Sequence, residues 1–230
     1  MADHGDLLAR LTTAVARTAG GSLSSRLCQA YRDLAGATGA AITVRYGTPE
    51  RVTLAATDES SARLEDLQDV IGEGPGHSAW RTGQVEIGTL PSPGASLWDL
   101  FVEAAEDVVE SAAIHAVPIL PGRNVFGVVT LYQVPRTDQP LRLERAELQF
   151  LANAIGAGLL RDASAFDEEG GGPWASRARI HQATGMVVAQ LGISPQDALA
   201  LLRAHAYVHE STLSDIAASV VERRLTFPIP

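Results

Sequence analysis

Apolar and polar residues follow a helical repeat in several stretches of the chain. Apolar residues recur every three or four positions there, which predicts helices at 5–19, 22–38, 61–70, 96–111 and 141–163. Ser22 stands where it can cap the second of these helices. The last carries an apolar stripe from Leu143 to Leu159, and we expect this stripe to pair with a second copy of the chain.

Shorter runs of β-forming residues lie between these helices. The runs at 40–47 and 50–58 flank a short turn, and so do the runs at 112–120 and 124–134. Two such runs joined by a turn are typical of a β-hairpin. One further strand is predicted at 84–88. The first part of the chain therefore mixes helices with hairpins, which indicates an α+β domain.

The pattern changes at 167–173, where the sequence DEEGGGP has no apolar side chain and contains three glycines. This composition is typical of a flexible linker and predicts a first domain at 1–166 and a second at 174–230. The second domain contains no convincing strand. Capping residues and helical periodicity divide it into three helices at about 175–191, 195–209 and 213–224.

Charge is distributed unequally between the two predicted domains. The chain has 230 residues and a net charge of -9, and all 18 of its basic residues are arginine. Residues 174–230 contain five arginines and four acidic residues, so they carry +1, while residues 1–173 carry -10. Nucleic-acid binding needs cationic surface. The second domain is therefore the better candidate for it, with modest affinity and weak salt dependence.

Cysteine content and the lack of targeting patterns indicate where in the cell we expect the protein. The single cysteine, Cys28, excludes an internal disulfide and a two-cysteine zinc site, and its helical setting favours a small buried side chain. A signal peptide has a basic region followed by an apolar one, and the acidic N-terminus lacks both. No apolar run reaches the length of about 18 residues that a membrane span needs. We expect a cytoplasmic protein with no membrane partner.

The residues provide no coherent catalytic or metal site. Serine, histidine and acidic residues are scattered without a nucleophile motif, so we do not expect an enzyme. The loop Gly72–Gly76 lacks the lysine and hydroxyl of a phosphate-binding loop and reads as a structural turn. His205 and His209 have a spacing that can hold zinc, but no third ligand completes the set. No pattern identifies a cofactor.

The three C-terminal helices resemble the ANTAR family, the RNA-binding module of transcription antitermination regulators. The matching positions occur in order along the segment: Ile180, Gln182–Gly185, Ala198, Leu202–Arg203, Ala206, Leu213 and Ile216–Ala217. The resemblance implies an all-α, three-helix domain. Many members carry lysine where this chain has Thr184, so one cationic RNA contact is missing or supplied elsewhere.

Residues 22–161 are similar to a GAF domain, a sensing or dimerising fold. Four short motifs carry this resemblance: Gly72–Pro75, Arg81–Gly83, Ala116–Ile119 and Phe126–Tyr132. It implies a central antiparallel sheet flanked by helices. A GAF domain followed by an ANTAR domain is a pairing of actinobacterial regulators. The family often has cysteine where this chain has Gly76, so no thiol chemistry is inferred for that loop.

Candidate RNA contacts come from helical spacing and from the ANTAR resemblance. Arg177, His181 and Thr184 lie at i, i+4 and i+7 and share one helix face. The alternative is that this face is ordinary solvated helix surface. The resemblance adds contacts at Gln182, Ala183, Gly185, Arg203 and Ala206.

A small-molecule pocket in the GAF-like domain is a further expectation. Its candidate walls are Trp80, Trp98, Phe101 and His115, for which ordinary core packing is the alternative.

Together, these features predict a two-domain antitermination regulator. By family analogy, two copies in a homodimer each hold one RNA hairpin loop of a nascent transcript and so prevent a terminator from forming. The GAF-like sensor would control RNA binding through a ligand, through a partner or through dimerisation. Two alternatives stay open: a protein-interaction module and a DNA-binding regulator.

Overall fold

The computed structural model describes residues 3–45, 51–94, 96–135, 141–162 and 173–227. These residues form two compact units, one built almost entirely from 3–162 and the other from 173–227, and each is described by itself. The predicted linker at 167–173 lies outside the described residues except for Pro173. The domain limits therefore stay a prediction.

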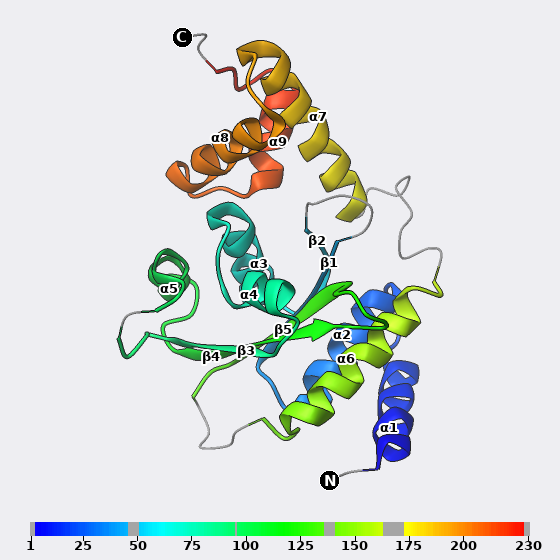
Figure 1. Cartoon of the computed structure of the whole chain (residues 1–230). Coiled ribbons are helices and arrows are strands. Elements are labelled where there is room, and N and C mark those ends of the chain that lie inside the picture. The colour runs from blue at the N-terminus through cyan, green and yellow to red at the C-terminus, as the bar shows by residue number, and fades with distance from the viewer. Residues whose placement is uncertain (1–2, 46–50, 95, 136–140, 163–172, 228–230) are drawn as a thin grey trace. The chain divides into compact units, whose positions relative to one another are not determined.

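The first unit is built on one five-stranded antiparallel sheet with the order β2-β1-β5-β4-β3 (Figure 1). The strands are β1 (Gly39–Val44), β2 (Val52–Ala56), β3 (Glu86–Leu90), β4 (Ala112–Ile119) and β5 (Gly127–Gln133). Both predicted hairpins are confirmed, since β1 pairs with β2 and β4 with β5. The pairing of β1 with β5 joins the hairpins into one sheet.

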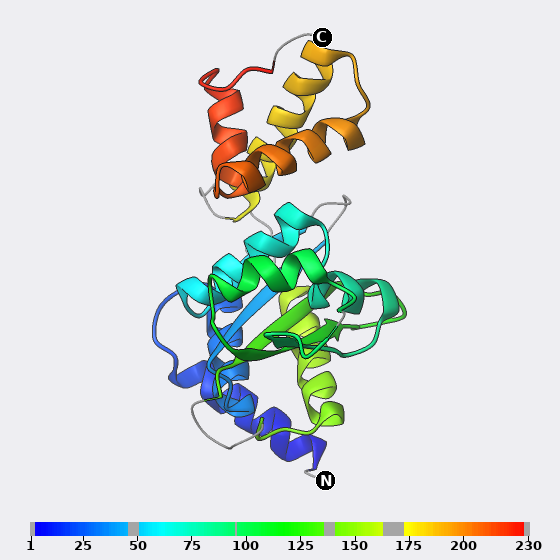
Figure 2. The same ribbon diagram turned by 90° about the vertical axis from the view of Figure 1, so that its left-hand side faces the viewer.

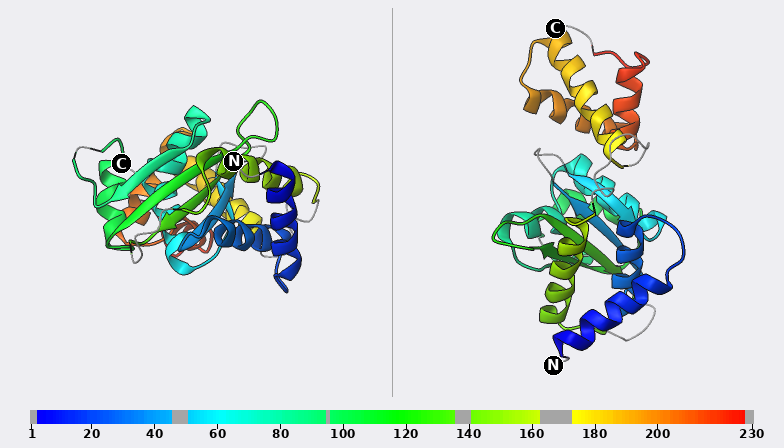
Figure 3. Two further views of the ribbon diagram at one scale, coloured as in Figure 1. Left: turned by 90° about the horizontal axis from the view of Figure 1, so that it is seen from below. Right: turned by 90° about the vertical axis from the view of Figure 1, so that its right-hand side faces the viewer.

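Helices cover both faces of this sheet (Figure 2). One face packs against α2 (Leu23–Ala35) and α6 (Arg145–Leu159), and α1 (His4–Arg17) contacts both of these helices. The other face is covered by α3 (Glu59–Ile71), α4 (Pro75–Thr82) and α5 (Asp99–Glu106). The views in Figure 3 show the same sheet with helices on its two faces. The predicted α+β architecture, with a central antiparallel sheet flanked by helices, is confirmed.

Several helix limits differ from those predicted, and for α2 and α6 the reason is local. Helix α2 ends at Ala35 rather than at 38, because Gly36 follows it with a left-handed φ of 70°. Helix α6 begins at Arg145 rather than 141, because Glu144 and Glu147 form a capping box. Helix α5 occupies only half of the predicted 96–111 and ends at Glu106.

The apolar stripe of α6 does not face outward, and the expectation that it pairs with a second copy is wrong. Leu148, Leu151, Ile155 and Leu159 are buried within the first unit. Gly156 lets α6 approach β4 so closely that an added Cβ would overlap the Ile119 side chain. The Tyr31 hydroxyl donates a hydrogen bond to the backbone oxygen of Leu148 at 2.9 Å and fixes α2 to α6. The stripe is thus part of the unit's own core.

The second unit consists of α7 (Pro173–Leu191), α8 (Pro195–Val208) and α9 (Leu213–Val221), which confirms the three predicted helices. Ser194 caps α8 and Thr212 caps α9, each accepting a hydrogen bond at 3.1 Å from a backbone N–H in the first turn. The core of the unit is made of small and branched side chains: Ala183, Val187, Ala198, Leu202, Ala206, Ile216, Ala217, Val220 and Phe227.

Candidate functional site

One face of α7 exposes small and polar side chains. Of the predicted RNA contacts, His181, Gln182 and Gly185 are exposed there. Thr184 is half-buried, and its hydroxyl donates to the Ile180 backbone oxygen at 2.8 Å. The Arg177 side chain lies outside the described residues. Three of the predicted contacts therefore share an accessible surface on one helix.

Gly185 is the unusual residue on this face. It has ordinary helical backbone, and an added Cβ would meet no atom within 4 Å. Glycine within a helix is less favourable than alanine by about 1 kcal/mol. No packing contact among the described residues requires a glycine here, and the surface at this position is open.

Ala183 and Ala206 do not belong to that surface. Both are fully buried, beside Val187 and Leu202 in the core of the second unit. Their small side chains allow the helices to approach closely, which is a structural contribution. Neither side chain has surface to offer an RNA contact in this conformation.

The cationic residues of the second unit are few and partly engaged. Arg203 is half-buried on α8 and makes a polar or ionic interaction of its own. Arg224 forms an exposed ion pair with Glu222 at 2.6 Å. Arg179 and Arg223 are exposed. The positive field of this unit is therefore weak.

His205 and His209 stack on each other rather than pointing to a common ligand set. Their ring centroids lie 4.7 Å apart, and the Phe227 ring meets His205 edge-on at 5.2 Å. Among the described residues, no group of three or more histidine, cysteine or acidic side chains has an arrangement that could hold a metal ion.

The four predicted pocket residues of the first unit do not line one site. Trp98 is buried and donates from Nε1 to the Ser78 hydroxyl at 2.8 Å, and Phe101 is buried on α5. Trp80 is half-buried with the Arg45 guanidinium 4.8 Å from its ring centre.

His115 lies on the other face of the sheet. Its strand neighbour Ala116 packs with Ala79 under α4, and successive strand side chains point to opposite faces. Burial lowers the pKa of His115 and favours its neutral form.

A buried polar cluster, which we call the Glu65 cluster, was not found by sequence reasoning. Glu65 on α3 pairs with Arg51, and the side chains of Glu65 and Arg51 are only 1% and 3% exposed. Thr43 on β1 donates to Glu65 Oε2 at 2.8 Å, and Gln68 donates to Oε1 at 2.9 Å. Glu65 and Gln68 stand three apart on a helix rich in polar residues, a pattern that sequence alone assigns to solvated surface.

The predicted turn Gly72–Gly76 is joined to this cluster; Gly72–Gly74 connect α3 to α4, whereas Pro75 and Gly76 already belong to α4. The Gly76 N–H donates to Gln68 Oε1 at 2.7 Å, and a Cβ on Gly76 would lie only 2.9 Å from that oxygen. Glu73 caps α5, accepting hydrogen bonds from the backbone of Leu100 at 3.0 Å and Phe101 at 3.2 Å. A Cβ at Gly76 would therefore displace the Gln68 side chain that accepts the Gly76 hydrogen bond.

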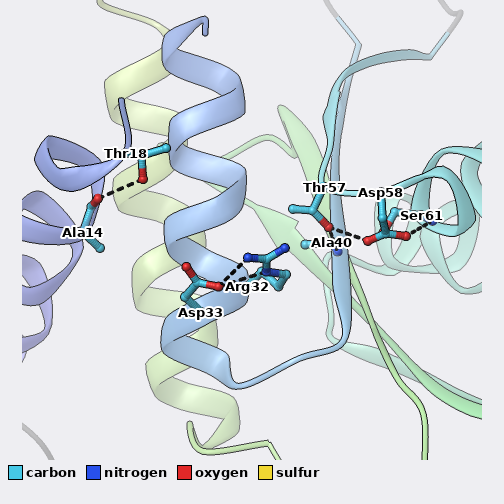
Figure 4. Close-up of polar contacts among 8 residues, drawn as sticks. All are labelled: Ala14, Thr18, Arg32, Asp33, Ala40, Thr57, Asp58 and Ser61. Carbon is cyan, nitrogen blue, oxygen red and sulfur yellow. Dashed lines mark hydrogen bonds and ion pairs between the residues drawn. The ribbon is translucent and has the colours of Figure 1, made fainter. Parts of the chain in front are cut away.

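A second polar cluster surrounds Asp58 at the start of α3 (Figure 4). Its carboxylate accepts hydrogen bonds from the Thr57 hydroxyl at 2.7 Å, from the Ser61 backbone at 2.8 Å and hydroxyl at 2.9 Å, and from the Tyr132 hydroxyl at 3.0 Å. Burial by itself would raise the pKa of Asp58, but these hydrogen bonds outweigh it and hold the pKa below its usual value. This arrangement ties α3 to β5.

Cys28 is fully buried beside the Ala55 backbone oxygen, as its helical setting predicted. Burial raises the pKa of its thiol to about 12, which leaves the inert protonated form at neutral pH.

No single helix among the described residues is long and apolar enough to cross a membrane. Ala178–Leu191 and Pro195–Val208 satisfy the length and composition of a span only as a pair, and that pair is bent by 109°.

A comparison with known protein families finds a match in the second unit. The model of the ANTAR domain family matches residues 174–221, which contain nearly all of α7 and the whole of α8 and α9. No curated protein matches the chain. The sheet topology of the first unit and this match together support the expected arrangement of a GAF-like domain followed by an ANTAR domain.

Several solved structures are similar to the chain at low identity. The nlh2 GAF domain of A. aeolicus in an inactive state is 15% identical, covers 69% of this chain and 97% of its own, and has a TM-score of 0.49. The chromophore-binding domain of Stigmatella aurantiaca bacteriophytochrome is 16% identical, with 70% and 62% covered and a TM-score of 0.44. SdiA in complex with octanoyl-rac-glycerol is 14% identical, with 96% of each chain covered and a TM-score of 0.44.

The Glu65 cluster predicts a difference between single and double variants. Arg51→Met leaves the Glu65 carboxylate buried without its cation and should lower the free energy of unfolding by about 3–5 kcal/mol. Combining it with Glu65→Leu removes the charge and should recover part of that loss. Urea unfolding followed by circular dichroism measures both. Arg32→Met, which breaks the more exposed pair with Asp33, is the control and should cost about 1 kcal/mol or less. A double variant no more stable than Arg51→Met would contradict the assignment.

The Asp58 cluster predicts a pH dependence. Because the pKa of Asp58 is lowered in the folded state, its contribution to stability is complete above the unfolded-state pKa of about 3.9 and is lost as the pH falls through the folded-state pKa. Asp58→Asn should therefore destabilise the chain at pH 7, and its difference from the unsubstituted chain should shrink at low pH. Thermal unfolding across this range tests it, with the exposed Asp107→Asn as control. A difference that stays constant with pH would count against the cluster.

Proposed function

We propose that this chain, whose residues 174–221 form an ANTAR domain, is a cytoplasmic transcription antitermination regulator that binds RNA hairpin loops. The family match over the three C-terminal helices carries the proposal. The exposed face of α7 adds to it, because His181 and Gln182 supply hydrogen-bonding groups beside the open surface at Gly185. RNA loops are read through such edge contacts with unpaired bases and through stacking.

The first unit acts as the regulatory half of the molecule. Its GAF-like sheet and helices support a role in sensing or dimerisation, and nothing in its polar clusters forms a catalytic constellation among the described residues. In a homodimer, two weakly charged RNA-binding units on one transcript gain affinity through their high effective concentration. A ligand or partner of the first unit would act by favouring the dimeric or RNA-competent state.

A protein-interaction role is the second candidate. Leu97 is 82% exposed and Leu100 is 55% exposed at the start of α5, and exposed apolar side chains of this size mark contact sites when they cluster. DNA binding has less support. Helix α9 has its arginines only after its C-terminal end, where Arg224 is paired with Glu222, and Asp215 stands in its first turn, where DNA phosphates would lie.

Binding of the full chain to an RNA with two hairpins tests the proposal directly. We expect measurable affinity at low salt and a shallow decrease as salt is raised, because few cations are available for phosphate contacts. Arg203→Ala should weaken binding about tenfold or more, since a hydrogen bond to a charged group is worth about 1.5–3 kcal/mol. A filter-binding or fluorescence titration at two salt concentrations measures both. If the dimeric chain does not bind the RNA at low salt, the proposed function is wrong.

Gly185→Ala separates RNA contact from folding. The alanine should stabilise α7 by about 1 kcal/mol and at the same time weaken RNA binding, because it fills the open surface. Gly158→Ala is the matched control: this helical glycine of α6 has only an ordinary contact with Leu27 and should not affect RNA affinity. Unchanged RNA affinity in Gly185→Ala would show that α7 does not present the contact face.

A further inference from the structure

Helix α8 exposes an apolar stripe on the side away from its buried residues. Ala200, Ala204, Tyr207 and Val208 are exposed and lie at i, i+4, i+7 and i+8, which places them along one side of the helix. Tyr207 is 50% exposed and Val208 is 73% exposed. The buried side of the same helix carries Ala198, Leu202 and Ala206. The side of the stripe also carries the exposed Asp197 one turn before Ala200, so the apolar stripe begins after the first turn of α8.

The charge of the second unit limits how it can bind RNA. Five arginines are opposed by four acidic residues within 174–230, and Arg224 is already paired with Glu222. Phosphate contacts require cations, so they can supply only a modest part of the affinity. The remainder must come from contacts that need no charge. Stacking of unpaired bases on aromatic side chains is the strongest of these, at about 1–3 kcal/mol per base.

Tyr207 is the aromatic side chain that suits this role. Among the described phenyl and phenol rings of the second unit, Phe227 is buried and the larger Tyr207 ring is half exposed, while the His205 and His209 rings stack on each other. It stands in the last turn of α8, so its backbone is fixed before any ligand arrives. Ala204, one turn earlier, leaves the approach to the ring open.

We propose that the Tyr207 ring, which is approached over Ala204, forms a stacking site for an unpaired nucleobase of the RNA loop. This inference rests on the proposed function, RNA binding, and adds the chemistry that holds the loop. The aromatic face supplies the contact and the phenolic hydroxyl is dispensable. The site discriminates single-stranded from fully paired RNA, because a paired base does not present its face.

The test compares Tyr207→Ala and Tyr207→Phe in the full chain, with Val208→Ala as the neighbouring control. The probes are a two-hairpin RNA with unpaired loops, the same RNA with abasic loop positions, and a fully paired duplex of equal length. Tyr207→Ala should weaken loop binding by about 5- to 150-fold, the equivalent of about 1–3 kcal/mol. Tyr207→Phe and Val208→Ala should stay within about twofold. The slope of affinity against salt should not change, because no phosphate contact is lost.

The abasic RNA keeps the test independent of protein folding. Removing the stacked base should weaken binding by the unsubstituted chain as much as Tyr207→Ala does, and should have no further effect on that variant. Loop binding that Tyr207→Ala leaves intact overturns the stacking site, and so does equal loss in Tyr207→Phe or in Val208→Ala. The stacking site is also rejected if Tyr207→Ala abolishes a protein complex and leaves RNA affinity unchanged. Failure of the unsubstituted chain to bind loop RNA instead rejects the proposed function itself.

Discussion

The arrangement of the first unit depends on a carboxylate that has been removed from solvent. A buried charge is tolerated only where a counter-charge and hydrogen bonds compensate for lost hydration. Glu65 obtains these from Arg51 just before β2, from Thr43 on β1 and from Gln68 on its own helix. The requirement fixes where α3 lies over the sheet. Gln68 then holds Gly76 and so positions α4, which makes the placement of two helices follow from one ion pair.

Local features of this molecule could be predicted from the sequence because neighbouring residues determine them. Periodicity and capping residues such as Ser194 and Thr212 identified the three C-terminal helices, and short turns identified both hairpins. The order of the strands could not be predicted in this way. It depends on the pairing of β1 with β5, whose residues Ala41 and Thr130 are far apart in the chain.

The residues that sequence reasoning misplaced share a different cause. An apolar stripe shows that a helix packs on something, but it does not show on what. Leu151 and Ile155 therefore pack inside the unit rather than against a second copy. Similarly, Glu65 has the sequence pattern of a surface acid, because Arg51 approaches it only through the tertiary fold. On α7, spacing did place His181 on an exposed face, whereas Ala183, which the family resemblance made an RNA contact, falls in the core.

The near-neutral second unit also has a consequence for timing. Charged partners are drawn together through long-range fields, and without such steering protein association typically proceeds at about 10⁵–10⁷ M⁻¹ s⁻¹. The second unit has a net charge of only +1, from five arginines and four acidic residues, so its long-range attraction for RNA is weak. Its encounters with a newly made hairpin would then be governed by protein concentration and by the number of copies tethered together. On the proposed function, such a chain would respond to its own abundance and assembly state more than to ionic conditions.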